Sequence, residues 1–149
     1  MPEYLELKVD KFTFKVAQDR DYNRRGVWAV YENGLVRIGL SDYLQQRSGD
    51  VAFADVVPAG TQVTIGEEFA QVETIKVNLE VPSPVSGRII EVNPKMELAP
   101  EAINLDPYGD GWLALVEPTG WESDRQRLLS PQDYYQAIKA EAEREAGSV

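Results

Sequence analysis

One stretch decides the fold, and it reads Phe69-Ala70-Gln71-Val72-Glu73-Thr74-Ile75-Lys76-Val77-Asn78-Leu79-Glu80-Val81. In its second half, apolar residues occupy the odd positions and polar residues the even ones, which is typical of a strand with one buried face. In its first half, the small and apolar residues occupy even positions instead. A strand changes parity only at a bulge or a turn, because a slip of one residue reverses every side chain. We therefore predict a tight turn over residues 73–76, with Lys76 projecting from it or beside it.

The predicted turn places a single amine on a stiff scaffold. Ile75 occupies a position where Gly or Asn would form a turn with less strain. The flanking strands are strongly patterned, and a second turn follows at Ser86-Gly87. A lysine on the solvent-facing side of a strand usually contributes only to solubility. The combination of features here favours a chemical role for Lys76.

Outward from this stretch, the chain predicts short strands separated by turns. The predicted strands cover residues 4–7, 12–16, 27–31, 35–40 and 112–116, with further strands over residues 50–92. The first two indicate edge strands or an ordered arm within residues 1–20. Asn33-Gly34 between two apolar runs is the strongest short-range hairpin signal. Gly and Pro recur through residues 50–92 at the spacing of a sandwich or barrel.

Three helical segments are predicted, over residues 41–49, 98–103 and 130–146. The last is the clearest, because Ser130 suits the N-cap and Pro131 the first helical position. Its apolar face at i, i+4 spacing consists of Tyr134, Ile138 and Ala142. We expect this C-terminal helix to pack on the β body.

Composition excludes several classes of function. The chain has 149 residues, and we expect one domain over residues 1–149. It contains no Cys and no His, which excludes Cys nucleophiles, Cys/His zinc sites, disulfides and Ser-His-Asp triads. Lys plus Arg number 15 and Asp plus Glu 25, a net charge of −10. Because an acidic surface repels nucleic acid and anionic membranes, we expect neither as a partner.

The remaining general features indicate a soluble protein. No apolar stretch approaches the roughly 18 residues that span a membrane, and no secretory signal is visible. We therefore expect a cytoplasmic location. Because no heptad repeat and no long apolar edge is present, we expect a monomer.

A carboxylate hydrolase is one alternative, with Asp106 and Asp110 as the reacting pair. Both residues lie in a loop with Pro107 and Gly109. Asx-turn hydrogen bonds of such a loop explain the two aspartates without catalysis, and we favour that interpretation.

Four ordered blocks of the sequence resemble the glycine cleavage system H protein family. The first is the predicted turn, which continues with Ser83-Pro84-Val85-Ser86-Gly87 and Glu91-Val92-Asn93. The others cover residues 36–43, 49–53 and 104–113. The last of these contains Asp-Pro-Tyr-Gly-x-Gly-Trp, which is a specific signal. The resemblance covers about residues 20–140.

This resemblance implies a mainly β fold, the barrel-sandwich hybrid of lipoyl and biotinyl carriers, with short helices and a C-terminal helix. It also implies lipoate as a covalent cofactor, amide-linked to Lys76. Glu73, Thr74, Ile75 and Val77 would flank the attachment site, and a lipoate-protein ligase or lipoyl transferase would recognise Glu73 and the hairpin. Biotin carriers usually hold their lysine between two methionines, which Ile75 and Val77 replace here.

The sequence departs from the family next to Trp28. The family usually carries His-Glu-Trp, and alignment on Tyr22 and Trp28 places Gly26 and Val27 at the His and Glu positions. In the family, this His lies near the cleft where the loaded arm places its aminomethyl cargo. Gly26 cannot donate a hydrogen bond, accept one or carry charge there. The departure suggests a different cargo.

Three functions fit these residues, and none is that of an enzyme. The first is a lipoate-binding protein of sulfur oxidation, whose lipoyl-lysine shuttles sulfur-bound intermediates or electrons with a heterodisulfide-reductase-like complex. The second is an H protein that carries the aminomethyl group between glycine cleavage enzymes. The third is an interaction module without lipoate. We expect the first, because of Gly26, Val27 and the unusually apolar strand after Lys76.

Overall fold

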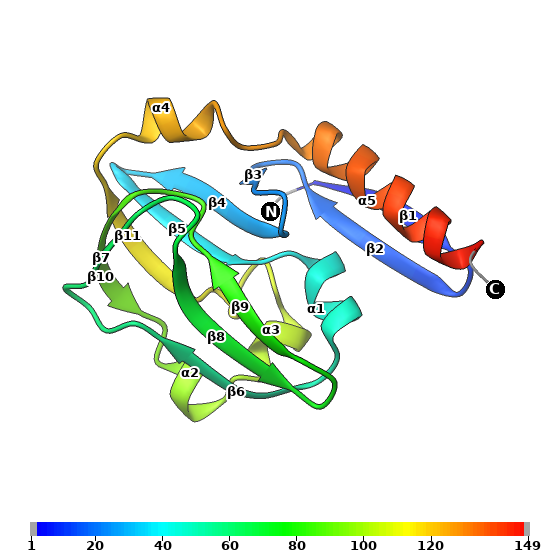
Figure 1. Ribbon diagram of the computed structural model, residues 1–149, viewed down its shortest axis with the longest axis horizontal. Coiled ribbons are helices and arrows are strands. Elements are labelled where there is room, and N and C mark those ends of the chain that lie inside the picture. The colour runs from blue at the N-terminus through cyan, green and yellow to red at the C-terminus, as the bar shows by residue number, and fades with distance from the viewer. Residues whose placement is uncertain (1–2, 148–149) are drawn as a thin grey trace.

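The computed structural model of the chain describes residues 3–147, and Figure 1 shows its arrangement. The strands are β1 (Tyr4–Val9), β2 (Phe12–Ala17), β3 (Asp21–Tyr22), β4 (Val27–Glu32), β5 (Leu35–Leu40), β6 (Val51–Val56), β7 (Gln62–Val63), β8 (Glu68–Thr74), β9 (Asn78–Pro82), β10 (Gly87–Val92) and β11 (Ala114–Pro118). The helices are α1 (Asp42–Ser48), α2 (Lys95–Leu98), α3 (Ala102–Leu105), α4 (Trp121–Arg125) and α5 (Pro131–Ala146). None of these helices has the length and apolar character needed to cross a membrane. The predicted domain also included residues 1, 2, 148 and 149, which lie outside the described residues.

Two antiparallel sheets enclose the main core (Figure 1). One has the strand order β3-β4-β5-β11-β10-β7 and the other the order β6-β8-β9. Ile38 and Ile89 from the first sheet and Val72 from the second are fully buried in one cluster. Each such side chain stabilises the fold by about 1.5–3 kcal/mol. The predicted mainly β architecture is confirmed, and within residues 3–147 the sheets remain open.

The hairpin predicted at Asn33-Gly34 forms between β4 and β5. Glu32 pairs with Leu35, so the two intervening residues make the whole turn. Both have positive φ, 54° at Asn33 and 82° at Gly34. This geometry matches the twist of the flanking strands, and Asn-Gly adopts it with little strain.

The N-terminal segment forms a hairpin of its own, β1 paired with β2, rather than an edge of the larger sheets. Helix α5 lies along this hairpin, as the right-hand side of Figure 1 shows. Ile138 and Ala142 of the helix share a buried cluster with Leu7 and Phe14 of the hairpin. The expectation that α5 packs on the β body was therefore only partly right. The first turn of α5 contacts the main sheets through Tyr134, whose ring stacks on that of Tyr22 in β3 with 4.3 Å between the ring centroids. The later turns of α5 cover the hairpin.

Local signals located the ends of the two longer helices well. Ser41 caps α1 by accepting a hydrogen bond from the Leu44 amide, and Ser130 caps α5 by accepting one from the Asp133 amide. The single turn predicted over residues 98–103 was wrong, because α2 ends at Leu98 and α3 begins only at Ala102. Pro100 disfavours helical geometry at the residue before it, and Ala99 accordingly has φ −154°. Helix α4 was not predicted.

Candidate functional site

The candidate site is the connection between β8 and β9. Strand β8 continues to Thr74 and β9 begins at Asn78, so residues 75–77 form the connection. The predicted turn over residues 73–76 was therefore placed too early. Glu73 still pairs with Asn78, and the Thr74 amide donates to the Val77 carbonyl at 2.8 Å. The ladder thus extends further toward the tip than the change of parity suggested.

The hydroxyl of Thr74 holds this turn together. Its oxygen accepts hydrogen bonds from the amides of Lys76 (3.1 Å) and Val77 (3.0 Å). The same hydroxyl donates to the carbonyl of Ser48 at 2.6 Å, at the end of α1. The Ile75 amide donates to the Asp50 carbonyl at 3.0 Å. Because Thr74 is buried, these bonds tie the turn to α1 with little competition from water.

The two apolar neighbours of Lys76 point into solvent. Ile75 is 75% exposed and Val77 is 44% exposed. The sequence predicted both on the buried face of a strand with Leu79 and Val81, and this was wrong. The buried face begins only at Leu79, because residues 75–77 lie beyond the edge of the core.

Lys76 itself lies at the surface and leans toward α1. Its Nζ donates to the carbonyl of Arg47 at 3.3 Å. A Cβ atom added at Gly49 would lie 3.1 Å from Lys76 Cδ, so Gly49 leaves room for the lysine stem. Within residues 3–147 the Lys76 amine forms no ion pair. An acyl group on Nζ would therefore break no salt bridge.

The sequence did not predict which residues contact the Lys76 side chain. Gly49 was identified as a helix C-cap, and its φ of 93° fits that role. Its second role beside Lys76, like that of the Arg47 carbonyl, depends on the contact between α1 and the turn. No local pattern in the sequence carries that information.

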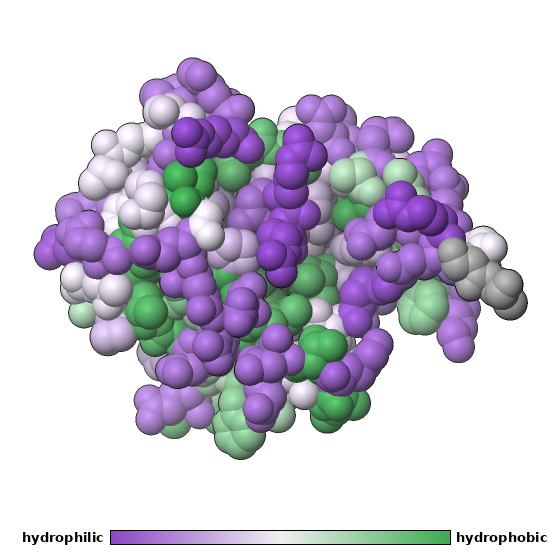
Figure 2. All heavy atoms as spheres, in the orientation of Figure 1, coloured by the Kyte–Doolittle hydropathy of each residue, from purple (hydrophilic) through white to green (hydrophobic). Residues whose placement is uncertain are grey.

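The outer face of the three-stranded sheet carries Glu73 and is acidic. Phe53 and Glu73 are direct neighbours across β6 and β8, and Phe53 is 68% exposed. Asp55 and Glu80 lie on the same outer face, and β6, β8 and β9 contain no Lys or Arg. On the view in Figure 2, hydrophilic side chains predominate and hydrophobic ones form patches between them. Lys76 therefore projects from the end of an acidic surface.

The carboxylates of the loop at residues 106–112 have structural partners. Asp106 accepts a hydrogen bond from the Asp110 amide at 2.9 Å, and a Cβ atom at Gly109 would lie only 2.3 Å from its carboxylate. Asp110 forms an ion pair with Lys95 at 3.1 Å. These contacts favour the Asx-turn interpretation over a hydrolytic pair.

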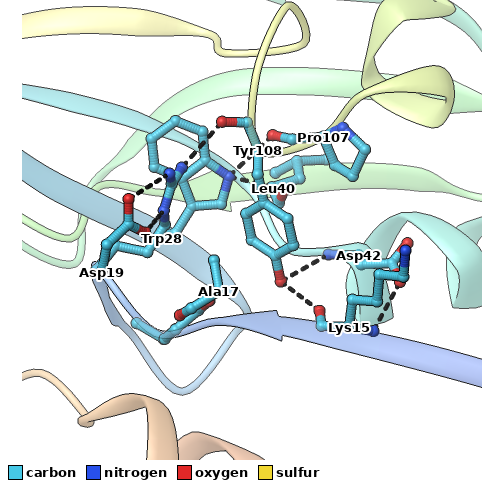
Figure 3. A network of polar contacts seen from close by, with 10 residues as sticks. Lys15, Ala17, Asp19, Trp28, Leu40, Asp42, Pro107 and Tyr108 are labelled. Carbon is cyan, nitrogen blue, oxygen red and sulfur yellow. Dashed lines mark hydrogen bonds and ion pairs between the residues drawn. The ribbon is translucent and has the colours of Figure 1, made fainter. Parts of the chain in front are cut away.

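The same loop fastens the N-terminal hairpin to the body, as Figure 3 shows. Trp28 Nε1 donates to the Pro107 carbonyl at 3.0 Å. The Tyr108 hydroxyl donates to the Lys15 carbonyl at 2.6 Å. The amide of Lys15 in turn donates to Asp42 at 2.9 Å. The hairpin therefore has a defined position beside α1.

Side chains from α1 and α5 lie against Gly26, the residue that aligns with the family's histidine. Gly26 has φ 91°, and a Cβ atom there would lie 2.9 Å from the Tyr134 hydroxyl and 3.1 Å from Leu44 Cβ. Tyr134 and Ser41 share a hydrogen bond of 2.6 Å at this point. Burial raises the pKa of the Tyr134 phenol, so this hydroxyl stays neutral. Val27 is fully buried in the core. A side chain at residue 26 would therefore crowd Tyr134 and Leu44 at its Cβ atom.

Comparisons with known proteins agree on one family. A family model described as glycine cleavage H-protein matches residues 20–141. The glycine cleavage system H protein of Saccharophagus degradans is 44% identical over 115 residues, which are 76% of this chain and 88% of that protein. A probable glycine cleavage system H protein of Pyrococcus abyssi is 38% identical over 128 residues, 85% of this chain and 95% of that protein.

A solved structure shares the fold. The crystal structure of a glycine cleavage system H protein from Mycobacterium marinum matches this chain with a TM-score of 0.75 and 31% sequence identity. The match covers 83% of this chain and 98% of the other. The H-protein-like fold implied by the sequence resemblance is therefore confirmed.

Proposed function

The chain belongs to the glycine cleavage H-protein family, whose members carry covalently attached lipoate, and we propose that Lys76 is its lipoyl-lysine. The protein is then a cofactor-bearing carrier and not an enzyme. The observation that supports the assignment is the position of Lys76 on a braced, exposed turn, with its amine free of ion pairs among residues 3–147.

The residues around Lys76 fit a lipoyl group. Lys76 would hold it through an amide at Nζ, and the group would supply two exchangeable sulfurs that this cysteine-free chain lacks. Thr74 keeps the turn in one geometry, and Gly49 leaves space for the lysine stem. The chain's own contribution is thus to present the arm at a fixed place.

We propose that the modifying enzyme, a lipoate-protein ligase or lipoyl transferase, recognises the acidic sheet face that ends at the turn. Glu73 is exposed and lies three residues before Lys76. It is held rigidly, because β8 pairs with a neighbouring strand on each side. Ile75 and Val77 add exposed apolar contacts on both sides of the lysine.

Intact mass spectrometry tests the lipoylation site. The chain is produced with a lipoate-protein ligase and lipoate, and we expect a mass gain of one lipoyl group. Lys76→Arg should abolish the gain. Lys11→Arg is the matched control, because Lys11 is also an exposed lysine in the turn of a hairpin. An unmodified wild type would favour the interaction module without lipoate. A lipoylated Lys76→Arg variant would show that a lysine other than Lys76 carries the lipoyl group.

We propose glycine cleavage as the pathway, with the glycine cleavage enzymes as partners. The relatives reported above are glycine cleavage H proteins, and they give no support to the expected role in sulfur oxidation. Sulfur oxidation with a heterodisulfide-reductase-like complex remains the second candidate, and it rests on Gly26 and Val27. Incubation of lipoylated protein with glycine and glycine cleavage enzymes, followed by intact mass, separates the two. An arm that gains the mass of the aminomethyl group supports glycine cleavage. An arm that stays unloaded in this incubation, and that is reduced only when the heterodisulfide-reductase-like complex is supplied instead, supports the alternative.

A further inference from the structure

Strand β6 lies at an open edge of the three-stranded sheet. In the order β6-β8-β9 it pairs only with β8, and Figure 1 shows it near the lower border of the molecule, next to α2. A groove of about 600 Å³ runs between β6 and the segment around α2. Residues 52–56 form one wall, and Met96 and Pro100 belong to the other. Because five consecutive strand residues line the groove, it follows the edge of β6 and not one of its faces.

The backbone groups along this edge are unpaired. The Val57 amide donates to the Phe69 carbonyl at 3.0 Å, across to the segment that begins β8. The direction of backbone groups alternates along an antiparallel strand, so the amides and carbonyls of Ala54 and Val56 point away from β8. Within residues 3–147, no group forms a hydrogen bond with them on that side. The edge therefore offers donors and acceptors to one further strand.

The start of β6 is protected, but the rest of its edge is not. The Val51 amide donates to Asn104 Oδ1 at 2.9 Å. A register shift follows between Val51 and Phe53, and beyond it the pairing with β8 is regular up to Val56. Edge strands commonly carry Lys or Pro, which discourage pairing with another chain, and β6 contains neither. The regular part of β6 is thus open to a partner.

The side chains along the edge define what an added strand would meet. Phe53 and Asp55 are exposed on the outer face of the sheet, and Phe53 is 68% exposed. Ala54 and Val56 pack against the main core cluster on the other face. Side chains of paired strands lie next to each other on each face. A strand bound here would therefore need polar side chains on its outer face and apolar ones on its inner face.

The charge of the groove selects the polar residues of that strand. Asp55 and Glu97 both line the groove and both are exposed, and no Lys or Arg lines it. Lys95, the basic residue of α2, forms an ion pair with Asp110 at 3.1 Å. Basic side chains on a bound strand would therefore find acidic neighbours without competition from the groove itself.

We propose that the β6 edge docks an extended segment of a partner protein as an additional strand, with basic residues facing outward and apolar residues facing inward. Main-chain hydrogen bonds to Ala54 and Val56 hold the segment, and Asp55 and Glu97 select its basic residues. A second copy of β6 is a poor occupant, because it would bring Asp55 against the same acidic surface. The site goes beyond the proposed function and does not depend on lipoylation of Lys76.

A designed peptide tests the proposal on the unmodified full chain. The probe has eight residues with alternating Lys and Val and is added to ¹⁵N-labelled protein. The amides of Ala54 and Val56 should show saturable shifts and slower hydrogen exchange, because they gain acceptors. A peptide of alternating Glu and Val should bind about tenfold or more weakly, because each ion pair contributes a fraction of a kcal/mol. No binding at about 1 mM of the Lys-Val peptide would overturn the proposal.

N-methylated peptides test the main-chain hydrogen bonds. Successive amides of a strand point to opposite edges, so methylation of every Val amide blocks one edge and methylation of every Lys amide blocks the other. One of the two peptides should lose affinity about tenfold or more, and the other should keep it. Equal affinities of the two peptides would overturn strand addition.

Charge reversal tests the position of the site. Asp55→Lys should weaken binding of the Lys-Val peptide about fivefold or more. Glu143→Lys is the matched control, since it makes the same change of charge at an exposed acid of α5, outside the groove, and should have a much smaller effect. Equal losses in the two variants would indicate attraction to net charge alone and would overturn the proposal. Circular dichroism verifies the fold, and the N-methylated peptides provide the test if Asp55→Lys does not fold.

Sedimentation without peptide tests the other occupant. A dimer whose formation slows hydrogen exchange at Ala54 and Val56 would assign the edge to a second copy of the chain, and would overturn the proposal of a basic partner segment. A monomer whose Ala54 and Val56 amides exchange rapidly would support it.

Discussion

Thr74 shows how one side chain can set the geometry of an exposed turn. Its hydroxyl binds two amides of the turn and one carbonyl of α1 at once. A hydrogen bond to a buried group is costly to lose, because the unpaired partner is left without water. The position of the exposed Lys76 therefore depends on Thr74, a buried residue two positions before it.

Thr74→Val should lower the free energy of unfolding by about 1–3 kcal/mol, because it leaves the Ser48 carbonyl without its donor. Urea denaturation measures this change. Thr74→Ser keeps the hydroxyl and should lose much less. A Val variant as stable as wild type would show that the hydroxyl does not brace the turn.

Gly26 gives a second prediction at this scale. Gly26→Ala adds a Cβ atom at positive φ, which costs about 1–2 kcal/mol, and also places it 2.9 Å from the Tyr134 hydroxyl. Gly34→Ala is the control, since Gly34 has φ 82° but no neighbour within 4 Å of the added atom. Thermal unfolding should therefore show a larger loss of stability for Gly26→Ala. Equal losses of stability in the two variants would mean that α1 and α5 shift to accommodate the added Cβ atom at almost no cost.

Among the elements, the pairing of α5 with the β1–β2 hairpin is the main departure from expectation. The helix pattern predicted the buried face at Tyr134, Ile138 and Ala142, and that face is confirmed. The surface that the helix covers was not predictable in the same way, because an apolar stripe is complementary to any apolar surface of suitable shape.

Ile138→Ala should destabilise this layer by about 2–5 kcal/mol, because it leaves a cavity against the hairpin. Hydrogen exchange followed by mass spectrometry should then show faster exchange in β1, β2 and α5 than in β8 and β9. Equal acceleration in all five elements would indicate that the hairpin and the sheets unfold together.

At the scale of the whole molecule, net charge governs encounters with partners. The chain carries 15 basic and 25 acidic residues, and the proposed acylation of Lys76 would change the net charge from −10 to 14 − 25 = −11. Such a surface steers toward basic docking patches, over a screening length of about 8 Å at physiological salt. The cytoplasmic location, the monomeric state and the single domain over residues 1–149 remain predictions.

Association with a partner enzyme should therefore slow as salt rises. Stopped-flow measurement of the association rate between low and high salt provides the test. Glu73→Gln should weaken the dependence on salt more than Glu143→Gln, which removes an exposed acid on α5, outside the acidic sheet face. A rate that is independent of salt would contradict electrostatic steering.

The sequence by itself determined the features that depend on neighbours along the chain. The Asn33-Gly34 hairpin, the caps at Ser41 and Ser130 and the presence of a turn beside Lys76 follow from alternation and from preferences within a few residues. The resemblance of its motifs to a known family indicated Lys76 as the lysine with a chemical role.

Only the tertiary structure decided what surrounds Lys76 and Gly26. The space at Gly49 and the crowding at Gly26 both join residues that are distant along the chain. Local preferences cannot specify such contacts, because many apolar faces are compatible with one another and close packing of the whole chain selects one arrangement.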